Sequence, residues 1–344
     1  MRLRIPVAAA IVLAALAFSP IAFAGTDPNW KGWFVNLDGA MANPGNVNTP
    51  LINSGPSDSA ASGGGDISNE VEYSDFGGDG AWSLGVGYSW GKKGSLSVSY
   101  WSYSATEDNS GSNDYYPNYN WFTVGPTASF GYTFYYPMKW DFEQEIKAST
   151  LDIEYKRSQS WDNPFVLTWG VGLRMASFED TVDGEYEMTN GAYSYRFPAS
   201  RKVDGDGFGF TGSVGAEYGF TDRFGLATNL RVGFLTSDID SDSQITDRDG
   251  YYTYPVTGAT WSEDRSQNDE LATTMDFNFN LSFTIGDHVV LEPGYFYSTW
   301  SDLPSVGLSR GNIGTDDQAA PVIQDENRDR ISWSGPSLRV KVKW

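Results

Sequence analysis

The stretch from Ala81 to Tyr100, AWSLGVGYSWGKKGSLSVSY, alternates large apolar residues with small ones almost without a break. The alternation pauses at Gly91-Lys92-Lys93-Gly94 and then continues with Leu96, Val98 and Tyr100. A period of two indicates a β-strand with two unlike faces. The small polar face therefore points either to bulk water, as in a one-sided soluble sheet, or into the lumen of a membrane barrel.

The first 24 residues have the pattern of a cleaved signal peptide. A basic start precedes an apolar run from Val7 to Phe18 and the small-x-small sequence Ala22-Phe23-Ala24. The run is short for a membrane span, so we expect cleavage after residue 24 and one mature domain, residues 25–344. No later apolar run approaches the roughly 18 residues of a membrane helix, so a membrane-embedded form of this chain would have to be a barrel.

Composition narrows the range of partners. The chain has 44 acidic and 23 basic residues, a formal net charge of −21, and it loses Arg2 and Arg4 with the signal peptide. Such acidity argues against nucleic acid as a partner. The chain has no cysteine, which excludes disulfides and thiolate metal sites.

Ten segments share the alternation, and most of them are long for strands of a soluble sheet. Their connections alternate between short and long. The short ones are 91–94, 158–163, 221–223 and 285–287, and the long ones are roughly 44–79, 107–143, 180–205, 236–269 and 300–328. Outer-membrane barrels show this asymmetry between periplasmic turns and outer loops. We therefore predict an all-β fold, an antiparallel transmembrane β-barrel of ten strands with long outer loops and short periplasmic turns.

Two regions leave alternatives open. Residues 115–140 are dense in aromatic residues and could hold an extra hairpin, making twelve strands, or a strand extension above the membrane. In the last strand, Ile331 and Trp333 have the opposite parity to Leu338. A bulge at Gly335-Pro336, which admits one extra residue, would explain this change.

The two faces of these strands predict the surroundings of their side chains. Large residues are expected to face lipid, with aromatic girdles that include Trp82, Tyr88, Trp90, Tyr295 and Tyr297. The opposite parity carries the charges expected to line the lumen: Asp38, Asp152, Glu154, Lys156, Arg174, Glu217, Arg231, Asp276 and Glu292. These charges are either the selectivity lining of a pore or ion pairs that fill a narrow lumen. Within this set we expect Arg174 and Arg231 to form a cluster with Asp152, Glu154 and Glu217.

Three other motifs were considered for chemistry. Gly207–Gly212 fits GxGxxG, but it lies inside a period-two run instead of opening a helix. The single histidine, His288, follows a short turn at the expected periplasmic edge, away from arriving substrates, so we expect no enzyme and no His-based zinc site.

The third motif is acidic. Asp238, Asp240 and Asp242 alternate as calcium ligands do, although Ser243 stands where an EF-hand has glycine. This segment is either a solvated acidic loop or a loose divalent-cation site shared with lipopolysaccharide phosphates. No other cofactor is expected.

The central hairpin resembles a known family. Leu151-Asp152-Ile153-Glu154-Tyr155, followed by Trp169-Gly170-Val171-Gly172-Leu173-Arg174, is similar to strands of the Legionella-type major-outer-membrane, pore-forming β-barrel family. The similarity covers residues 140–235. It implies a channel or an abundant surface barrel of a Gram-negative outer membrane, without catalytic residues.

The sequence thus predicts a narrow outer-membrane pore for small solutes, with a cation preference because acidic outer loops attract cations. The alternative is a surface interaction or adhesion protein whose acidic, aromatic loops bind a partner while the barrel anchors them. Expected partners are membrane lipid, lipopolysaccharide and, through the terminal aromatic Trp344, the barrel-assembly machinery.

Overall fold

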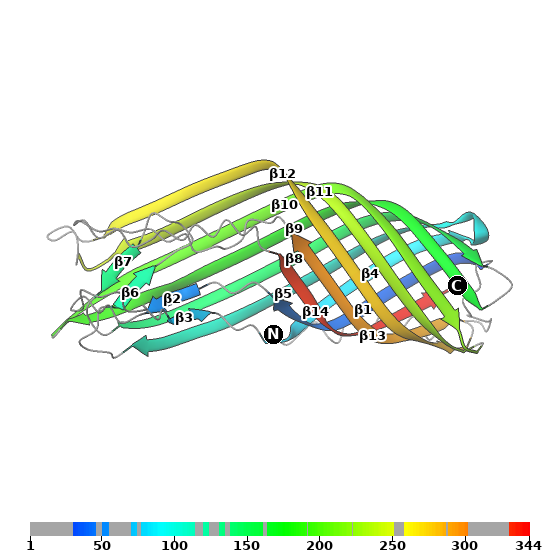
Figure 1. The fold of residues 1–344 in the computed structure, drawn as a ribbon, viewed down its shortest axis with the longest axis horizontal. Coiled ribbons are helices and arrows are strands. Elements are labelled where there is room, and N and C mark those ends of the chain that lie inside the picture. The colour runs from blue at the N-terminus through cyan, green and yellow to red at the C-terminus, as the bar shows by residue number, and fades with distance from the viewer. Residues whose placement is uncertain are drawn as a thin grey trace, which may run out of the picture.

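The computed structural model describes residues 30–45, 50–54, 70–73, 77–113, 120–123, 131–134, 138–160, 164–190, 192–221, 223–250, 258–286, 288–301 and 330–344. The predicted signal peptide lies outside them. The described chain forms a closed antiparallel barrel in the ring order β1-β14-β13-β12-β11-β10-β9-β8-β5-β4 (Figure 1). The prediction of a ten-stranded barrel is therefore confirmed.

The barrel strands differ greatly in length. Their bounds are β1 Lys31–Gly45, β4 Asp79–Trp90, β5 Ser95–Asn113, β8 Met138–Ser160, β9 Phe165–Asn190, β10 Tyr193–Gly219, β11 Phe224–Asp247, β12 Ala259–Ile285, β13 Val289–Ser301 and β14 Ile331–Lys343. The only helical element among the described residues is the 3₁₀ turn η1, Gly91–Lys93, and no described helix is long and apolar enough to span a membrane.

Two small sheets lie apart from the barrel wall. One pairs β2 (Pro50–Ser54) with β3 (Glu70–Tyr73), and the other pairs β6 (Asn120–Thr123) with β7 (Gly131–Phe134). The second hairpin falls in the aromatic region where two additional barrel strands were considered. It pairs only with itself, so the twelve-strand alternative is wrong.

The turn Gly91–Gly94 shows how the sequence closes one end of the barrel. The N–H of Gly94 donates to the carbonyl of Gly91 (2.9 Å), and the N–H of Trp90 donates to the carbonyl of Gly94 (2.8 Å). Gly91 and Gly94 have φ angles of 71° and 127°, which side chains disfavour. The two glycines therefore allow β4 to reverse directly into β5.

An apolar belt surrounds the lower part of the barrel, where the short turns lie. Its outward side chains are exposed in the protein, for example 55% for Val171 and 71% for Phe210. The belt includes Trp82, Leu84 and Val86 on β4, Trp169, Leu173 and Met175 on β9, and Phe277, Phe279, Leu281 and Phe283 on β12. A closed barrel leaves no unpaired strand edge, so this apolar face is suited to lipid.

Beyond the belt, toward the left end of Figure 1, strands β5 and β8 to β12 continue as an outer extension, formed by residues 104–113, 138–149, 177–206, 236–247 and 259–270. Positions nearer this end of the barrel are called upper, and those nearer the short turns are called lower. Much of the predicted outer loops 180–205 and 236–269 is therefore paired strand, and this part of the loop prediction is wrong. Between 107 and 143, β5 and β8 pair as far as Asn113 and Met138, which confirms the alternative of a strand extension at the ends of the aromatic region. The β9–β10 hairpin pairs without a break as far as Asn190 and Tyr193. The paired backbone continues because alternation persists there, with the apolar residues moved to the inner face.

The predicted bulge in the last strand is also wrong. Against β13, the register of β14 runs unbroken through Trp333, Gly335 and Pro336 to Leu338. Ile331 and Trp333 instead point into the barrel, where they are 3% and 0% exposed. The change of parity in the sequence marks a change in which face is apolar.

A bulge does occur elsewhere, between β11 and β12. The register shifts by one residue between Ser237 and Ile239. Opposite this point Asp269 has a φ of 60°, and its N–H donates to Oδ1 of Asp238 (3.1 Å). One of the three predicted calcium ligands thus satisfies the backbone of a bulge.

Candidate functional site in the barrel lumen

A polar cavity of about 350 Å³ occupies the lumen inside the belt. Every barrel strand contributes to its wall, from Trp30 and Lys343 near the short turns to Trp101 and Phe296 farther up. From Ser83 to Ser89 on β4 and from Ser95 to Ser99 on β5, the inward residues are only serine and glycine. Small side chains on these two strands leave room for long charged side chains from the others.

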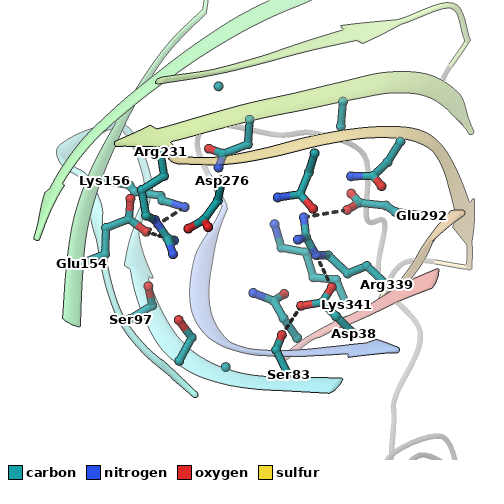
Figure 2. Close-up of a pocket in the computed structure, with 18 of the residues that line it drawn as sticks. Asp38, Ser83, Ser97, Glu154, Lys156, Arg231, Asp276, Glu292, Arg339 and Lys341 are labelled. Atoms are coloured by element: carbon teal, nitrogen blue, oxygen red, sulfur yellow. Dashed lines mark hydrogen bonds and ion pairs between the residues drawn. The ribbon is translucent and has the colours of Figure 1, made fainter. Parts of the chain in front are cut away.

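All nine predicted lumen residues lie on the wall of this cavity: Asp38, Asp152, Glu154, Lys156, Arg174, Glu217, Arg231, Asp276 and Glu292. Parity alone located them, because alternate residues of a strand face opposite sides of the sheet. Eight of the nine take part in two ion-pair clusters, one on each side of the cavity (Figure 2).

The first cluster joins β8, β9, β11 and β12. Arg174 donates to both carboxylate oxygens of Asp152 (2.7 and 3.0 Å) and to Asp276 (2.6 Å). Arg231 bridges Asp152 and Glu154 at 2.7 Å each. Arg174 is only 2% exposed, so each charge depends on its partners. The expected cluster around Arg174 and Arg231 is present.

Glycine makes space for this cluster. A Cβ atom at Gly170 would lie 2.9 Å from Oε1 of Glu154 and 2.6 Å from the Ser213 hydroxyl. That hydroxyl donates to Glu154, and Lys156 pairs with the same carboxylate (3.0 Å). A larger residue at Gly170 would displace the carboxylate from its donors.

Glu217 is not part of the first cluster, contrary to expectation. Its partner across β11 is Ala227, whereas Arg231 pairs with Ser213. Glu217 is thus four residues from Ser213, roughly 13 Å along the strand at about 3.3 Å per residue. This distance places it nearer the short turns, below the two arginines.

The second cluster joins β1, β4, β13 and β14. Arg339 donates to Asp38 and lies 3.5 Å from Glu292, and Ser83 also donates to Asp38 (Figure 2). Register explains this set, because Arg339 is the direct cross-strand partner of both Asp38 and Glu292. Opposite charges at such paired positions stabilise strand pairing.

Three basic residues of the last strand were missing from the predicted lining. Arg339, Lys341 and Lys343 all line the cavity, and their parity opposite Leu338 and Val340 was the signal that could have located them. With them, the wall carries six acidic and six basic side chains. The lumen is therefore balanced in charge although the whole chain carries −21.

An apolar septum lies above the cavity and crosses the lumen. It is a packed cluster of buried residues from every barrel strand except β10: Ala42, Ala81, Tyr103, Ala105, Ile146, Ala148, Ala176, Phe178, Leu235, Ala272, Phe296, Trp300, Ile331 and Trp333. Trp333 is at its centre, with ring centroids 5.1 Å from Trp300 and 5.8 Å from Trp101. The septum ends the polar part of the lumen.

Some polar atoms of the septum have no hydrogen-bond partner. The indole N–H groups of Trp300 and Trp333 and the hydroxyl of Tyr103 are buried without one. An unsatisfied buried donor costs about 1–3 kcal/mol. Packing of the aromatic rings thus stabilises the septum, while its unsatisfied buried donors destabilise it.

A smaller polar group is buried in the outer extension. Gln144 donates to Asp180 (2.8 Å), and Arg201 lies 3.9 Å from the same carboxylate. Burial lowers the pKa of Arg201 to about 10 and raises the pKa of Asp180 above its ordinary value. Two nitrogens of the Arg201 guanidinium, Nε and Nη1, are buried without a hydrogen-bond partner.

The remaining predicted residues lie away from the cavity. Asp238, Asp240 and Asp242 are exposed on the outer face of β11, and the described residues contain no group of three acidic or histidine side chains placed to hold a metal ion. The divalent-cation site stays a prediction.

His288 and Trp344, the last two residues for which the sequence makes a prediction, lie at the end of the barrel with the short turns. His288 lies there, with Nδ1 2.7 Å from the carbonyl of Lys343. Trp344 exchanges two backbone hydrogen bonds of 3.0 Å with Trp33 and is 55% exposed. The absence of enzymatic activity and recognition of Trp344 by the assembly machinery stay predictions.

Comparisons with known proteins find similar barrels at low identity. The chain resembles the outer membrane protease OmpT of Escherichia coli (TM-score 0.42, 8% identity, 94% of this chain and 99% of that chain covered). It also resembles the outer membrane protein OprG of Pseudomonas aeruginosa (0.31, 13%, 75% and 99%) and the toluene transporter TodX of P. putida (0.29, 7%, 91% and 90%). No family model and no curated protein matches. Similarity at this level says nothing about activity, and the architecture rests on the strand pairing described above.

Proposed function

We propose that this protein is an outer-membrane β-barrel of a Gram-negative bacterium that conducts small polar solutes along a narrow path gated by the apolar septum. The observation that carries the proposal is the polar cavity, which is lined by every strand and ends at the septum. A barrel that served only as an anchor would gain nothing from a hollow polar lumen. The apolar belt and the short turns at one end support the outer membrane as its location.

The charge balance of the lumen changes the source of the expected cation preference. The cavity wall is neutral overall, so the acidic charge that could attract cations is on the outer extension. Its outward face carries Asp141, Glu143, Glu145, Glu179, Asp183, Glu185, Glu187, Asp204, Asp206, Asp238, Asp240 and Asp242, against Lys139, Lys147, Arg196 and Lys202. Such a field enriches cations at the outer mouth within a Debye length of about 8 Å.

Conductance of refolded protein in planar bilayers tests the gate. Trp333→Ala removes the central ring of the septum, so we expect unit conductance to rise several-fold over rare, small wild-type steps. Trp169→Ala, which removes an indole from the lipid-facing side, is the matched control and should conduct like wild type. Heat-modifiable gel mobility verifies folding of each variant. Silence of the folded Trp333→Ala barrel would overturn the channel proposal.

Reversal potentials under a potassium chloride gradient test selectivity. We expect cation preference that weakens as salt rises, because the outer charges are exposed and screened. Replacing Asp238, Asp240 and Asp242 together by Asn should reduce the preference without changing unit conductance. Anion selectivity at low salt would contradict the proposal.

A second candidate function is a surface interaction protein in which the barrel is an anchor. The observation in its favour is the septum itself, since Trp333 and Ile146 at its centre are 0% exposed. In that case the acidic outer extension would meet a cationic partner. Folded septum variants that conduct nothing would favour this candidate.

A further inference from the structure

Glu217 and Lys341 line the cavity outside its two ion-pair clusters. Among the described residues, neither Glu217 on β10 nor Lys341 on β14 makes a salt bridge or a side-chain hydrogen bond. The ammonium of Lys341 lies over the ring of Phe34, 5.7 Å from its centroid. Every other acidic residue of the cavity wall is in one of the two clusters.

Both charges are unpaired because of the register. Arg339 lies two residues before Lys341 on the same face of β14. It forms ion pairs with the two carboxylates of that wall, Asp38 and Glu292. The residue of β10 that pairs with Arg231 is Ser213. Glu217 lies four residues from Ser213, toward the short turns, and is therefore too far from the first cluster to join it. Glu217 and Lys341 therefore stay outside both clusters.

The two residues face each other across the lumen. In the ring of strands, β10 and β14 are separated by β11, β12 and β13 on one side, and by five strands on the other. They thus lie on nearly opposite walls, and both residues line the same cavity. In the first cluster three carboxylates meet three basic side chains, and in the second Asp38 and Glu292 share Arg339. Outside the clusters the wall carries Glu217, Lys341 and, beside Trp30 near the short turns, Lys343.

We propose that the cavity binds a small zwitterion, such as a free amino acid, with its ammonium group at Glu217 and its carboxylate at Lys341. A simple anion or cation would satisfy one of these charges and leave the other unpaired, whereas a zwitterion satisfies both. Asn229 and Asn278 supply neutral polar wall, and the contact with Phe34 holds the Lys341 ammonium by a cation–π interaction. This inference rests on the proposed function, for which it names the class of solute.

Binding to the refolded, detergent-solubilised barrel tests the proposal. The probes are the ω-amino acids from glycine to 6-aminohexanoate, each compared by isothermal titration calorimetry with its N-acetyl and amide derivatives. We expect at least one chain length to bind about tenfold or more tighter than both derivatives, because each derivative loses one charged contact. Equal affinity for the zwitterion and its derivatives at every length would overturn the proposal.

Variants assign the two ends of the ligand. Glu217→Gln should abolish the preference over the N-acetyl derivative, and Lys341→Gln the preference over the amide. The exchange Glu217→Lys with Lys341→Glu should restore zwitterion binding in the reversed orientation. Lys202→Gln, on the outward face of the outer extension, is the control and should bind as wild type does. Unchanged affinity in both single variants would sink the assignment.

The same samples separate this inference from the channel proposal. Conductance without zwitterion preference would remove the inference and leave the channel. Zwitterion binding in a barrel that stays silent even as Trp333→Ala would leave the binding site and remove transport as its purpose.

Discussion

The belt and the outer extension are built from the same strands but have opposite polarity. On β9, the outward residues Trp169, Val171 and Met175 are apolar and exposed in the belt, while inward Arg174 is buried in an ion cluster. Farther along the same strand, outward residues are acidic, and inward Val182, Tyr186 and Met188 are 6%, 2% and 0% exposed. The lower barrel is thus apolar outside and polar inside, and the upper barrel is the reverse.

This difference shows that the solvent decides which face is apolar, while backbone pairing is indifferent to it. In lipid the outer face must be apolar, and the inner face carries ion pairs around a polar cavity. Where the wall rises into water, the ordinary hydrophobic effect applies and the inner face becomes a core. The inversion takes place within a few residues of Met175 on β9 and Phe208 on β10, which marks the edge of the belt.

The largest expected effect tests the inner face of the outer extension. Ile239→Asp on β11 would place a carboxylate at a position that is 3% exposed in an apolar core. We expect the local opening free energy of β10 and β11 above the belt to fall by about 4 kcal/mol, from lost packing and an unpaired buried charge. Amide hydrogen exchange of residues 236–247 measures it.

The matched control for Ile239→Asp is Asn229→Asp, ten residues lower on the same inward face. Asn229 lines the polar cavity, so a carboxylate there meets polar surroundings. Protection of residues 236–247 should remain at the wild-type level in this control. Equal loss of protection in the two variants would mean that the inner faces of the two regions do not differ.

The sequence predicts the fold correctly wherever the large residues of a strand point outward. Period-two alternation with large residues outward located the strands of the belt, the nine lumen residues and the strand number. It failed at Ile146, Phe178 and Trp333, where the apolar parity changes face. When lipid is assumed to surround the whole barrel, a move of the apolar residues to the inward parity resembles the end of a strand or a bulge. For this reason the sequence predicts loops in place of the outer extension and a bulge near Trp333.

The site was harder to predict than the fold, because ion pairing depends on register across strands. Parity placed Arg174 and Glu217 on the same inner wall, but their separation along the barrel follows from hydrogen-bonded partners. Closure of the barrel places β14 between β1 and β13, so that Arg339 lies directly opposite Asp38 from the start of the chain and Glu292 from near its end. Such neighbours leave no periodic trace in the sequence.

The outer faces of the two regions provide the next test. Val214 and Asp206 lie on the same outward face of β10, with Val214 six residues inside the edge of the belt near Phe208 and Asp206 just beyond that edge. Val214→Arg should lower the free energy of unfolding from lipid vesicles by roughly 2–4 kcal/mol, as expected for Arg deep in the lipid-facing belt. Asp206→Arg should change it by no more than about 0.5 kcal/mol. Urea titration gives both values, and similar costs would place the edge of the belt elsewhere.

The smallest expected effect concerns ion pairs in the two regions. In the outer extension, exposed Lys147 contacts Glu145 (2.7 Å) and Glu179 (2.9 Å), whereas the lumen clusters are buried. An exposed pair contributes only about 0.2–1 kcal/mol, because water and salt screen it. Lys147→Gln should therefore destabilise the outer extension by no more than that, and half-molar salt should erase the difference.

The pH dependence of this contact follows from its acid. The ammonium of Lys147 lowers the pKa of Glu179 below its ordinary value, first through a side-chain hydrogen bond. A carboxyl group whose pKa is lower in the folded state contributes stability above its unfolded pKa and loses it as the pH falls through the folded pKa. The difference between wild type and Lys147→Gln should thus be fully present at pH 7, begin to shrink near the unfolded glutamate value of about pH 4.3, and vanish only when the pH is below the lower folded pKa. Hydrogen exchange of β8 and β9 above the belt measures it, and a difference that persists in strong acid would mean that Lys147 acts by packing its aliphatic stem instead of by charge.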